Sequence, residues 1–242
     1  MRPVPHRSPV AIAAAALALA LVGAAPRLSA APAAPAAPAA RHAVAQGPAL
    51  EPYERIAQWP ARQTLSAGVL QNVVALDVAA DGRVFIADSG AGGVHVMLPS
   101  GLFLPPFGAT GEGPERLGGV GRLAVDQTAG KVYVLDTGTR RLTSWGLDGG
   151  YLGAWKDLDG AAVAVGPDGR VYVADRERNA IGAYDAAGTL LFSVGRAGTD
   201  EGQFSLMTDV SVSPDGLTLA VGDLNQLRVQ LFDLAAAGAV FR

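Results

Sequence analysis

Four aspartates end four similar apolar segments of the chain and are the first candidates for chemistry. They are Asp88, Asp136, Asp175 and Asp223, spaced 48, 39 and 48 residues apart. A ring of carboxylates could bind a cation. An aspartate that ends a strand also accepts hydrogen bonds from backbone N–H groups of the next turn. Because the residue recurs in every copy, we expect it to stabilise each copy rather than to bind a metal.

Charged residues that do not recur from copy to copy are better candidates for ligand binding, because function concentrates in loops. Guanidinium groups bind carboxylates with two parallel hydrogen bonds, so arginine-rich loops suit a carboxylate, a sugar acid or a peptide. The sequence therefore predicts a ligand site in the loops that carry Arg140, Arg141, Arg176, Glu177, Arg178, Asn179, Glu115 and Arg116.

No catalytic residue, metal ligand or cofactor is expected. The chain has no cysteine, and His95 is the single histidine after residue 50. A zinc site or a nucleophilic triad needs partners that one histidine does not supply. We expect His95 to be a strand-surface residue.

The elements that position these residues follow from an internal repeat. Six residues after each aspartate stands an aliphatic residue, and nine residues after it stands a larger apolar one. Each copy predicts four antiparallel strands joined by short turns, several of them Asp-Gly. Repetition of four-stranded units at this spacing predicts an all-β fold, a β-propeller with four blades at about 73–119, 120–160, 161–208 and 209–242.

The segment Gly169–Asp175 resembles an NHL repeat, as do Arg141-Leu142, Arg228-Val229 and the connector Gly195–Phe204. The connector Gly108–Pro114 resembles that of exported bacterial six-bladed NHL-like propellers. The resemblance extends over about 53–242, but Gly93 and Ala180 stand where the pattern usually has arginine. It implies propeller blades and a ligand on the loop face.

The number of blades does not fit a complete six-bladed ring. Six blades need roughly 260 residues, whereas 192 follow residue 50, and these hold four copies. Tyr53–Trp59 is expected to form an outer strand before the first copy. These observations favour an incomplete six-bladed propeller over a four-bladed one. An open arc would leave a blade face and an edge strand exposed, which would favour aggregation.

The N-terminal 50 residues differ from the rest of the chain. A basic start and the apolar run Val10–Val22 predict a signal peptide over 1–30, with an uncleaved anchor as the alternative. The Ala/Pro-rich segment 31–50 predicts a disordered linker. We expect export to the periplasm or the exterior, with no stable membrane span beyond the signal segment.

The net charge and the lack of recognisable catalytic residues together favour a binding function. After residue 50 there are 15 Lys and Arg against 22 Asp and Glu, so nucleic acid is not an expected partner. The sequence predicts an exported, tethered module that binds a protein, peptide or glycan on its loop face. The alternatives are a hydrolase or lyase of the six-bladed class with a metal at the channel mouth, or a structural component of the envelope.

Overall fold

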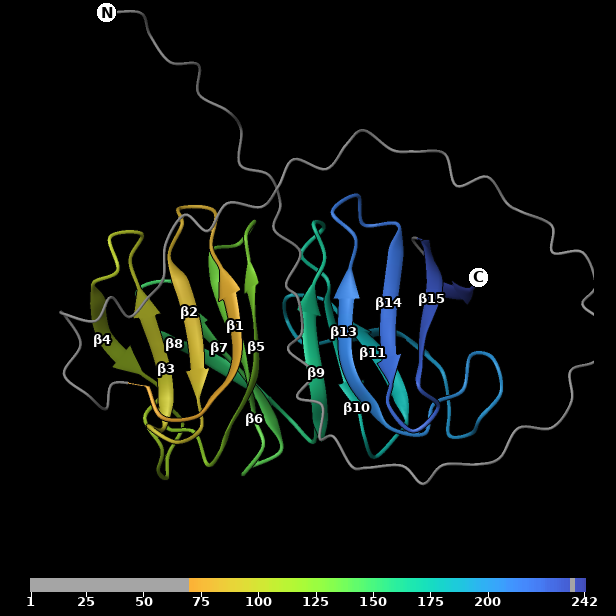
Figure 1. The fold of residues 1–242 in the computed structure, drawn as a ribbon, viewed down its shortest axis with the longest axis horizontal. Helices are drawn as coiled ribbons and strands as arrows, with labels where there is room; N and C mark the ends of the chain where they lie inside the picture. The colour runs from red at the N-terminus through yellow and green to blue at the C-terminus, as the bar shows by residue number, and fades with distance from the viewer. Residues whose placement is uncertain (1–69, 236–237) are drawn as a thin grey trace, which may run out of the picture. The chain divides into compact units, whose positions relative to one another are not determined.

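A computed structural model describes residues 70–235 and 238–242. The expected signal peptide, the linker and the strand at Tyr53–Trp59 lie outside the described residues. Sixteen strands form four sheets of four antiparallel strands each, and within every sheet the strands follow one another in chain order (Figure 1). The described residues contain no helix, and therefore no helical membrane span is found among them. The prediction of an all-β propeller with four four-stranded blades is confirmed.

The strand bounds define the blades, numbered here in chain order. Blade 1 contains β1 (Val73–Val78), β2 (Val84–Asp88), β3 (Gly93–Met97) and β4 (Phe103–Phe107). Blade 2 contains β5 (Val120–Asp126), β6 (Lys131–Asp136), β7 (Arg141–Gly146) and β8 (Tyr151–Lys156). Blade 3 contains β9 (Gly160–Val165), β10 (Val171–Asp175), β11 (Ala180–Tyr184) and β12 (Leu190–Val194). Blade 4 contains β13 (Met207–Val212), β14 (Thr218–Asp223), β15 (Arg228–Ala235) and β16 (Gly238–Phe241).

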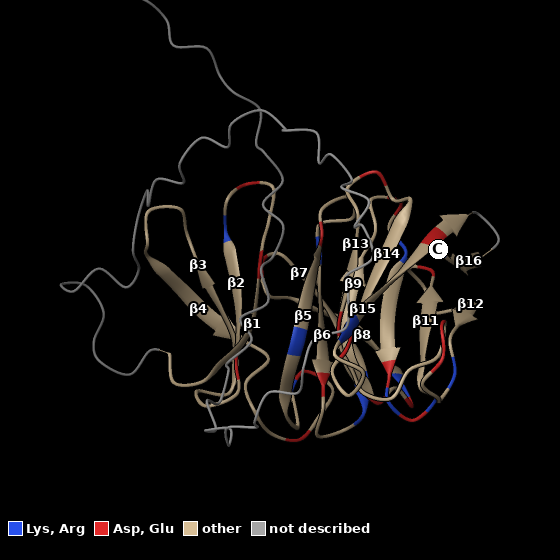
Figure 2. Ribbon diagram, turned by 45° about the vertical axis from the view of Figure 1, so that its right-hand side comes forward, with Lys and Arg blue, Asp and Glu red and all other residues tan. Residues whose placement is uncertain are grey.

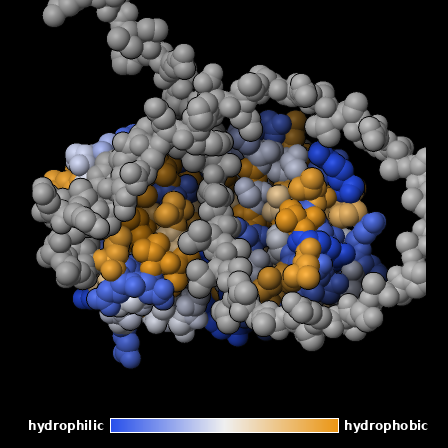
Figure 3. Space-filling model, viewed as in Figure 1, coloured by the Kyte–Doolittle hydropathy of each residue, from blue (hydrophilic) through white to orange (hydrophobic). Residues whose placement is uncertain are grey.

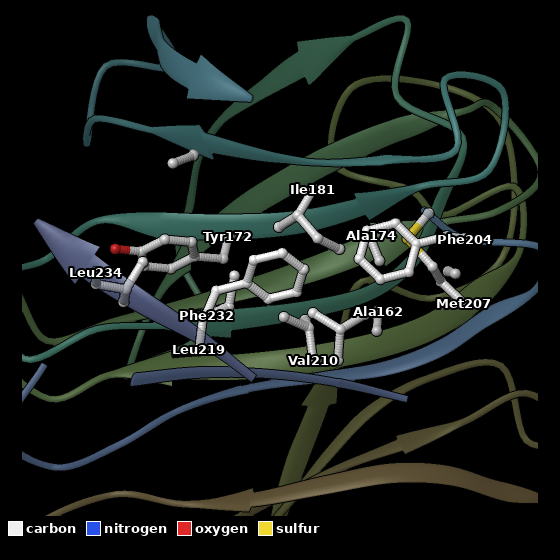
Figure 4. Close-up of a cluster of buried hydrophobic side chains, with 13 residues drawn as sticks. Ala162, Tyr172, Ala174, Ile181, Phe204, Met207, Val210, Leu219, Phe232 and Leu234 are labelled. Atoms are coloured by element: carbon white, nitrogen blue, oxygen red, sulfur yellow. The ribbon is translucent and has the colours of Figure 1, made fainter. Parts of the chain in front are cut away.

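The core consists of three apolar clusters, one at each interface between consecutive blades. The first strands of the blades contact one another in the order β1, β5, β9, β13. Three residues before the repeated aspartate, Phe85, Tyr133 and Tyr172 each point toward the following blade and are buried. Figure 4 shows Tyr172 of blade 3 beside Phe232 and Leu234 of blade 4. Because successive strand residues point to opposite faces, each second strand is apolar on both sides.

Polar contacts also connect the first two blades. The backbone N–H of Val125 donates to Oδ2 of Asp77 at 2.8 Å, and the side chain of Gln127 bonds backbone groups of Val78 and Ala80 at 2.7 Å. Burial raises the pKa of the Asp77 carboxyl group, although the N–H of Val125 opposes this shift. These bonds fix the position of the first strand of blade 1 against the first strand of blade 2.

The faces of blades 1 and 4 that pack on no described blade carry exposed apolar side chains. Leu76 on β1 is 53% exposed and Val229 on β15 is 67% exposed. Figure 3 shows the corresponding apolar patches over β1–β3 and over β13–β15. At the position of Phe85, Tyr133 and Tyr172, blade 4 has Ala220, so its outer face lacks the aromatic ring of the other blades.

Connectors between blades are of two kinds. The connectors at 108–119 and 195–206 have twelve residues each, whereas the connector at 157–159 has three. Both long connectors close on themselves through a parallel bridge, Thr110 with Leu117 and Ala197 with Phe204. Leu117 and Phe204 are fully buried. The long connectors therefore form compact, anchored loops, whereas the short one contributes only Leu158 to the core between blades 2 and 3.

Candidate functional site

The repeated aspartates are buried where the second strand of each blade ends. Asp88 accepts four backbone N–H bonds of 2.7–2.9 Å, two from the segment before β1 (Gln71, Asn72) and two from the loop after β2 (Gly90, Ala91). In blade 4, Asp223 accepts bonds from Ser205 and Leu206 before β13. The carboxylates of Asp88, Asp136 and Asp223 thus join the strand that each ends to the segment that enters its blade.

An arginine five residues after the aspartate connects two blades to their long connectors. The Nε of Arg141 donates to Oδ2 of Asp136 at 2.9 Å, and its Nη2 donates to the backbone oxygens of Gly113 and Arg116. In blade 4, Nη2 of Arg228 donates to the backbone oxygens of Asp200 and Gln203 and lies 3.8 Å from Oδ2 of Asp223, while its Nε makes no hydrogen bond. These arginines hold connectors in place, so their guanidinium groups are already engaged.

Blade 3 departs from this pattern because the connector before it is short. The residue five positions after Asp175 is Ala180. Arg178, three positions after Asp175, forms the ion pair with the aspartate instead. This pairing raises the pKa of Arg178 above its usual value. The same Arg178 also donates to the backbone oxygen of Asp157 at 3.3 Å. The missing arginine of the repeat is therefore replaced from a different position of the same loop.

The loops after the second strands share one left-handed residue. It stands four residues after the aspartate and is Gly92 (φ 74°), Arg140 (φ 53°), Asn179 (φ 48°) or Leu227 (φ 49°). Residues with a Cβ rarely adopt this conformation, which costs roughly 1–2 kcal/mol. In blade 2 it directs Arg140 outward toward blade 3, where its guanidinium forms an ion pair with the carboxylate of Glu177.

A cavity of about 490 Å³ lies between these loops of blades 2 and 3. It is lined by Thr139 and Arg140 of blade 2, Glu177 and Arg178 of blade 3, and Asp157 of the short connector. Asp157 also has a positive φ of 60°. Two of the five lining residues are thus held in a strained conformation, a feature that is frequent at functional sites. Figure 2 shows charged residues concentrated in the loops and at strand ends.

The structure brings together three of the eight predicted ligand residues, Arg140, Glu177 and Arg178. The guanidinium of Arg141 donates to Asp136, and that of Arg176 donates to Asp159 and to the backbone oxygen of Gly160. The remaining three, Glu115, Arg116 and Asn179, do not line the cavity. Thr139 was not predicted. Its position next to Arg140 in the same loop is the signal that could have identified it.

The expectation that His95 is a strand-surface residue is correct for the strand and wrong for the surface. Its side chain is 8% exposed on β3, because Phe103 and the neighbouring strand cover the ring, and its Nε2 has no hydrogen-bond partner. Within residues 70–235 and 238–242, no group of three or more His, Asp or Glu side chains is arranged to hold a metal ion.

Hydrogen bonds keep two of the repeated carboxyl groups ionised despite burial. Burial alone would raise the pKa of Asp88, but four backbone N–H donors lower it further than burial raises it. For Asp136, burial is again opposed by the Thr139 hydroxyl, the guanidinium of Arg141 and backbone donors, and the pKa falls below its ordinary value.

We therefore expect acid to destabilise the protein through these two groups. A carboxyl group with a lowered folded pKa contributes its full stability above the unfolded value of about 3.9, and this is lost as the pH falls through the folded pKa. The pKa of Asp77 is raised in the folded protein, so protonation of this group at low pH favours the folded state and partly offsets the loss. Urea unfolding between neutral pH and about pH 3 should show the free energy of unfolding falling below about pH 4. A constant or rising value there would contradict this expectation.

Comparisons with known proteins are consistent with this geometry. The family model of the NHL repeat matches residues 161–184, which span β9, β10 and β11. No curated protein matches the chain.

Solved structures of low sequence identity share the fold. A streptogramin B lyase matches with a TM-score of 0.54 at 15% identity, covering 69% of this chain and 52% of that one. The hydrazine synthase of Kuenenia stuttgartiensis matches with a TM-score of 0.55 at 21% identity, covering 74% of this chain and 51% of that one. The virginiamycin B lyase of Staphylococcus aureus matches with a TM-score of 0.53 at 16% identity, covering 70% of this chain and 55% of that one. The chain spans about half the length of these structures, and the likeness shows the fold alone.

Proposed function

Since this chain is a β-propeller with an NHL repeat in its third blade, we propose that it is an exported binding module. Its ligand is a peptide or glycan that carries a carboxylate, held in the cavity between the loops of blades 2 and 3. The observation that carries the proposal is the cavity of about 490 Å³ over the short connector. There Arg140 and Glu177 pair with each other and not with the blade framework.

Arg140 and Glu177 have properties expected of a ligand site. Their side chains are 52% and 61% exposed, so their ion pair contributes little to stability. A ligand carboxylate can replace Glu177 as the partner of the guanidinium, and the freed Glu177 can accept hydrogen bonds from the ligand. The basic and apolar N-terminus supports the exported location.

The proposal is tested by ligand capture on arrays of peptides and acidic glycans. We expect Arg140→Ala to weaken capture of the best ligand about tenfold, the effect of losing one charge-assisted hydrogen-bond pair. Glu177→Ala should change the selectivity among ligands. The fold should be unaffected, since neither side chain bonds the framework. Replacing Arg176 or Arg178 is less informative, because both side chains also donate to backbone oxygens, those of Gly160 and Asp157.

The matched control is Arg196→Ala, which removes an exposed arginine from the connector at 195–206 and leaves the cavity intact. It should capture ligand as the unmodified protein does. Equal capture by the Arg140→Ala variant and by this control would overturn the site. Two of the similar structures are lyases, so a captured ligand that is converted to product would favour an enzyme over a binding module.

A further inference from the structure

A second cavity, of about 410 Å³, lies at the other ends of the strands in blades 2 and 3. Turns between first and second strands, and between third and fourth strands, surround it. Its lining includes Asp126, Thr128, Asp168, Arg170, Asp185 and Leu191. Three carboxylates therefore face one guanidinium, and Arg170 is already paired with Asp168 at 3.3 Å.

Asp126 is the unusual residue of this cavity. It is 1% exposed, and its Oδ1 accepts the N–H groups of Thr128 and Ala129 at 2.8–2.9 Å, which closes the turn. Its Oδ2 has no hydrogen-bond partner. The other blades place Ala79, Gly166 and Ser213 at this turn position, and a carboxylate two residues later closes the turn instead (Asp81, Asp168 and Asp215). Asp126 is thus the one turn carboxylate among the described blades that lies at the buried end of its strand.

A second buried oxygen near Asp126 also lacks a partner. Tyr133 on β6 is 1% exposed and its hydroxyl makes no hydrogen bond. Burial raises the pKa of Tyr133, and the nearby charge of Asp126 raises it further. Two unpaired buried oxygens cost free energy, since an unsatisfied group bears its desolvation penalty of about 1–3 kcal/mol. A donor that enters the cavity, which Asp126 lines, would relieve the penalty at Asp126 Oδ2.

We propose that this cavity binds an aliphatic ammonium group, the lysine side chain of a partner chain. An ammonium brings a positive charge and three N–H donors, which match the unpartnered Oδ2 of Asp126 and the carboxylates of Asp168 and Asp185 in the cavity lining. The apolar side chains of Leu191, Ala129 and Ala186 line the same cavity and would contact the four-carbon stem. No metal-binding cluster is present among the described residues, so an organic cation fits better than a bare ion. This site is independent of the cavity that Arg140 lines.

The test uses nuclear magnetic resonance titration of the full chain with Nα-acetyl-lysine methylamide. Its uncharged counterpart, Nα-acetyl-norleucine methylamide, serves as the comparison ligand. We expect saturable shifts of the Thr128, Ala129 and Gly130 amides with the lysine compound and none with norleucine. Asp126→Asn keeps an oxygen for the Thr128 and Ala129 amides but removes the charge, and should raise the dissociation constant tenfold or more.

Two further variants keep the outcome decisive. Tyr133→Phe retains the ring that packs 5.5 Å from Trp155 and removes only the hydroxyl, which is not part of the cavity lining, so it should bind lysine as the unmodified protein does. Asp148→Asn alters an exposed turn aspartate of the same blade that bonds Gly150 and lies outside the cavity; it should bind as the unmodified protein does. The proposal is wrong if norleucine binds equally, if lysine gives no saturable shift, or if Asp126→Asn binds unchanged.

Discussion

Replacing Asp136 with alanine is expected to lower the free energy of unfolding by about 3–5 kcal/mol, the usual result of removing one partner of a buried ion pair. The carboxylate accepts bonds from the backbone of Gly119 and from the hydroxyl of Thr139, and it pairs with Arg141. Its loss leaves these donors unsatisfied inside the blade. It also releases the connector at 108–119, which Arg141 holds. Urea unfolding measures the change.

Asp148→Ala is the matched comparison for this substitution. Asp148 is exposed, and its side chain accepts a single hydrogen bond, from the N–H of Gly150 at 3.0 Å. We expect a loss of about 0.5–1.5 kcal/mol, the net value of one ordinary hydrogen bond. If the two variants unfold at the same urea concentration, the repeated aspartates do not anchor the blades as their bonds indicate.

Tyr172→Ala is expected to cost about 3–5 kcal/mol, the range for truncating a large buried ring. The ring lies in the cluster between blades 3 and 4 and makes an edge contact with Phe192, with the ring centres 6.4 Å apart. Blade 4 has Ala220 at the same repeat position, so alanine suits the backbone there. The loss therefore reports the packing of the ring against blade 4 and against Phe192 of its own blade, and not local strain. Thermal and urea unfolding both measure it.

Leu152→Ala provides the comparison for the Tyr172 substitution. Leu152 on β8 is 56% exposed, and exposed side chains that lie outside such contacts change stability by about 0.5 kcal/mol or less. A loss for Tyr172→Ala no larger than that for Leu152→Ala would show that the interface between blades 3 and 4 contributes little to stability.

The blades could be predicted from the sequence because the repeat has a physical cause. Residues two and three before each aspartate point to opposite faces of a strand that is covered on both sides, as Val134 and Tyr133 do in blade 2. Both positions must therefore be apolar, which makes the pattern visible in every copy. Strand bounds follow from the same constraint.

The candidate site was predictable only in part. Sequence spacing places Arg140, Arg141 and Arg178 in equivalent loops, but it does not show which guanidinium the framework uses. That depends on connector length, since Arg141 has a long connector to hold and Ala180 has none. The spare oxygen of Asp126 was not predicted either. Its signal was a carboxylate at a turn position where the other blades have Ala79, Gly166 and Ser213.

The three-residue connector has a consequence for how such a site can arise and disappear. The cavity beside Arg140 exists because 157–159 omits the nine residues by which the other two connectors are longer. An insertion there would fill the cavity and would give an arginine at position 180 a backbone to hold. A change of loop length at this place would thus exchange the proposed ligand cavity for an anchored connector. Surface loops tolerate such changes of length more readily than cores tolerate substitution.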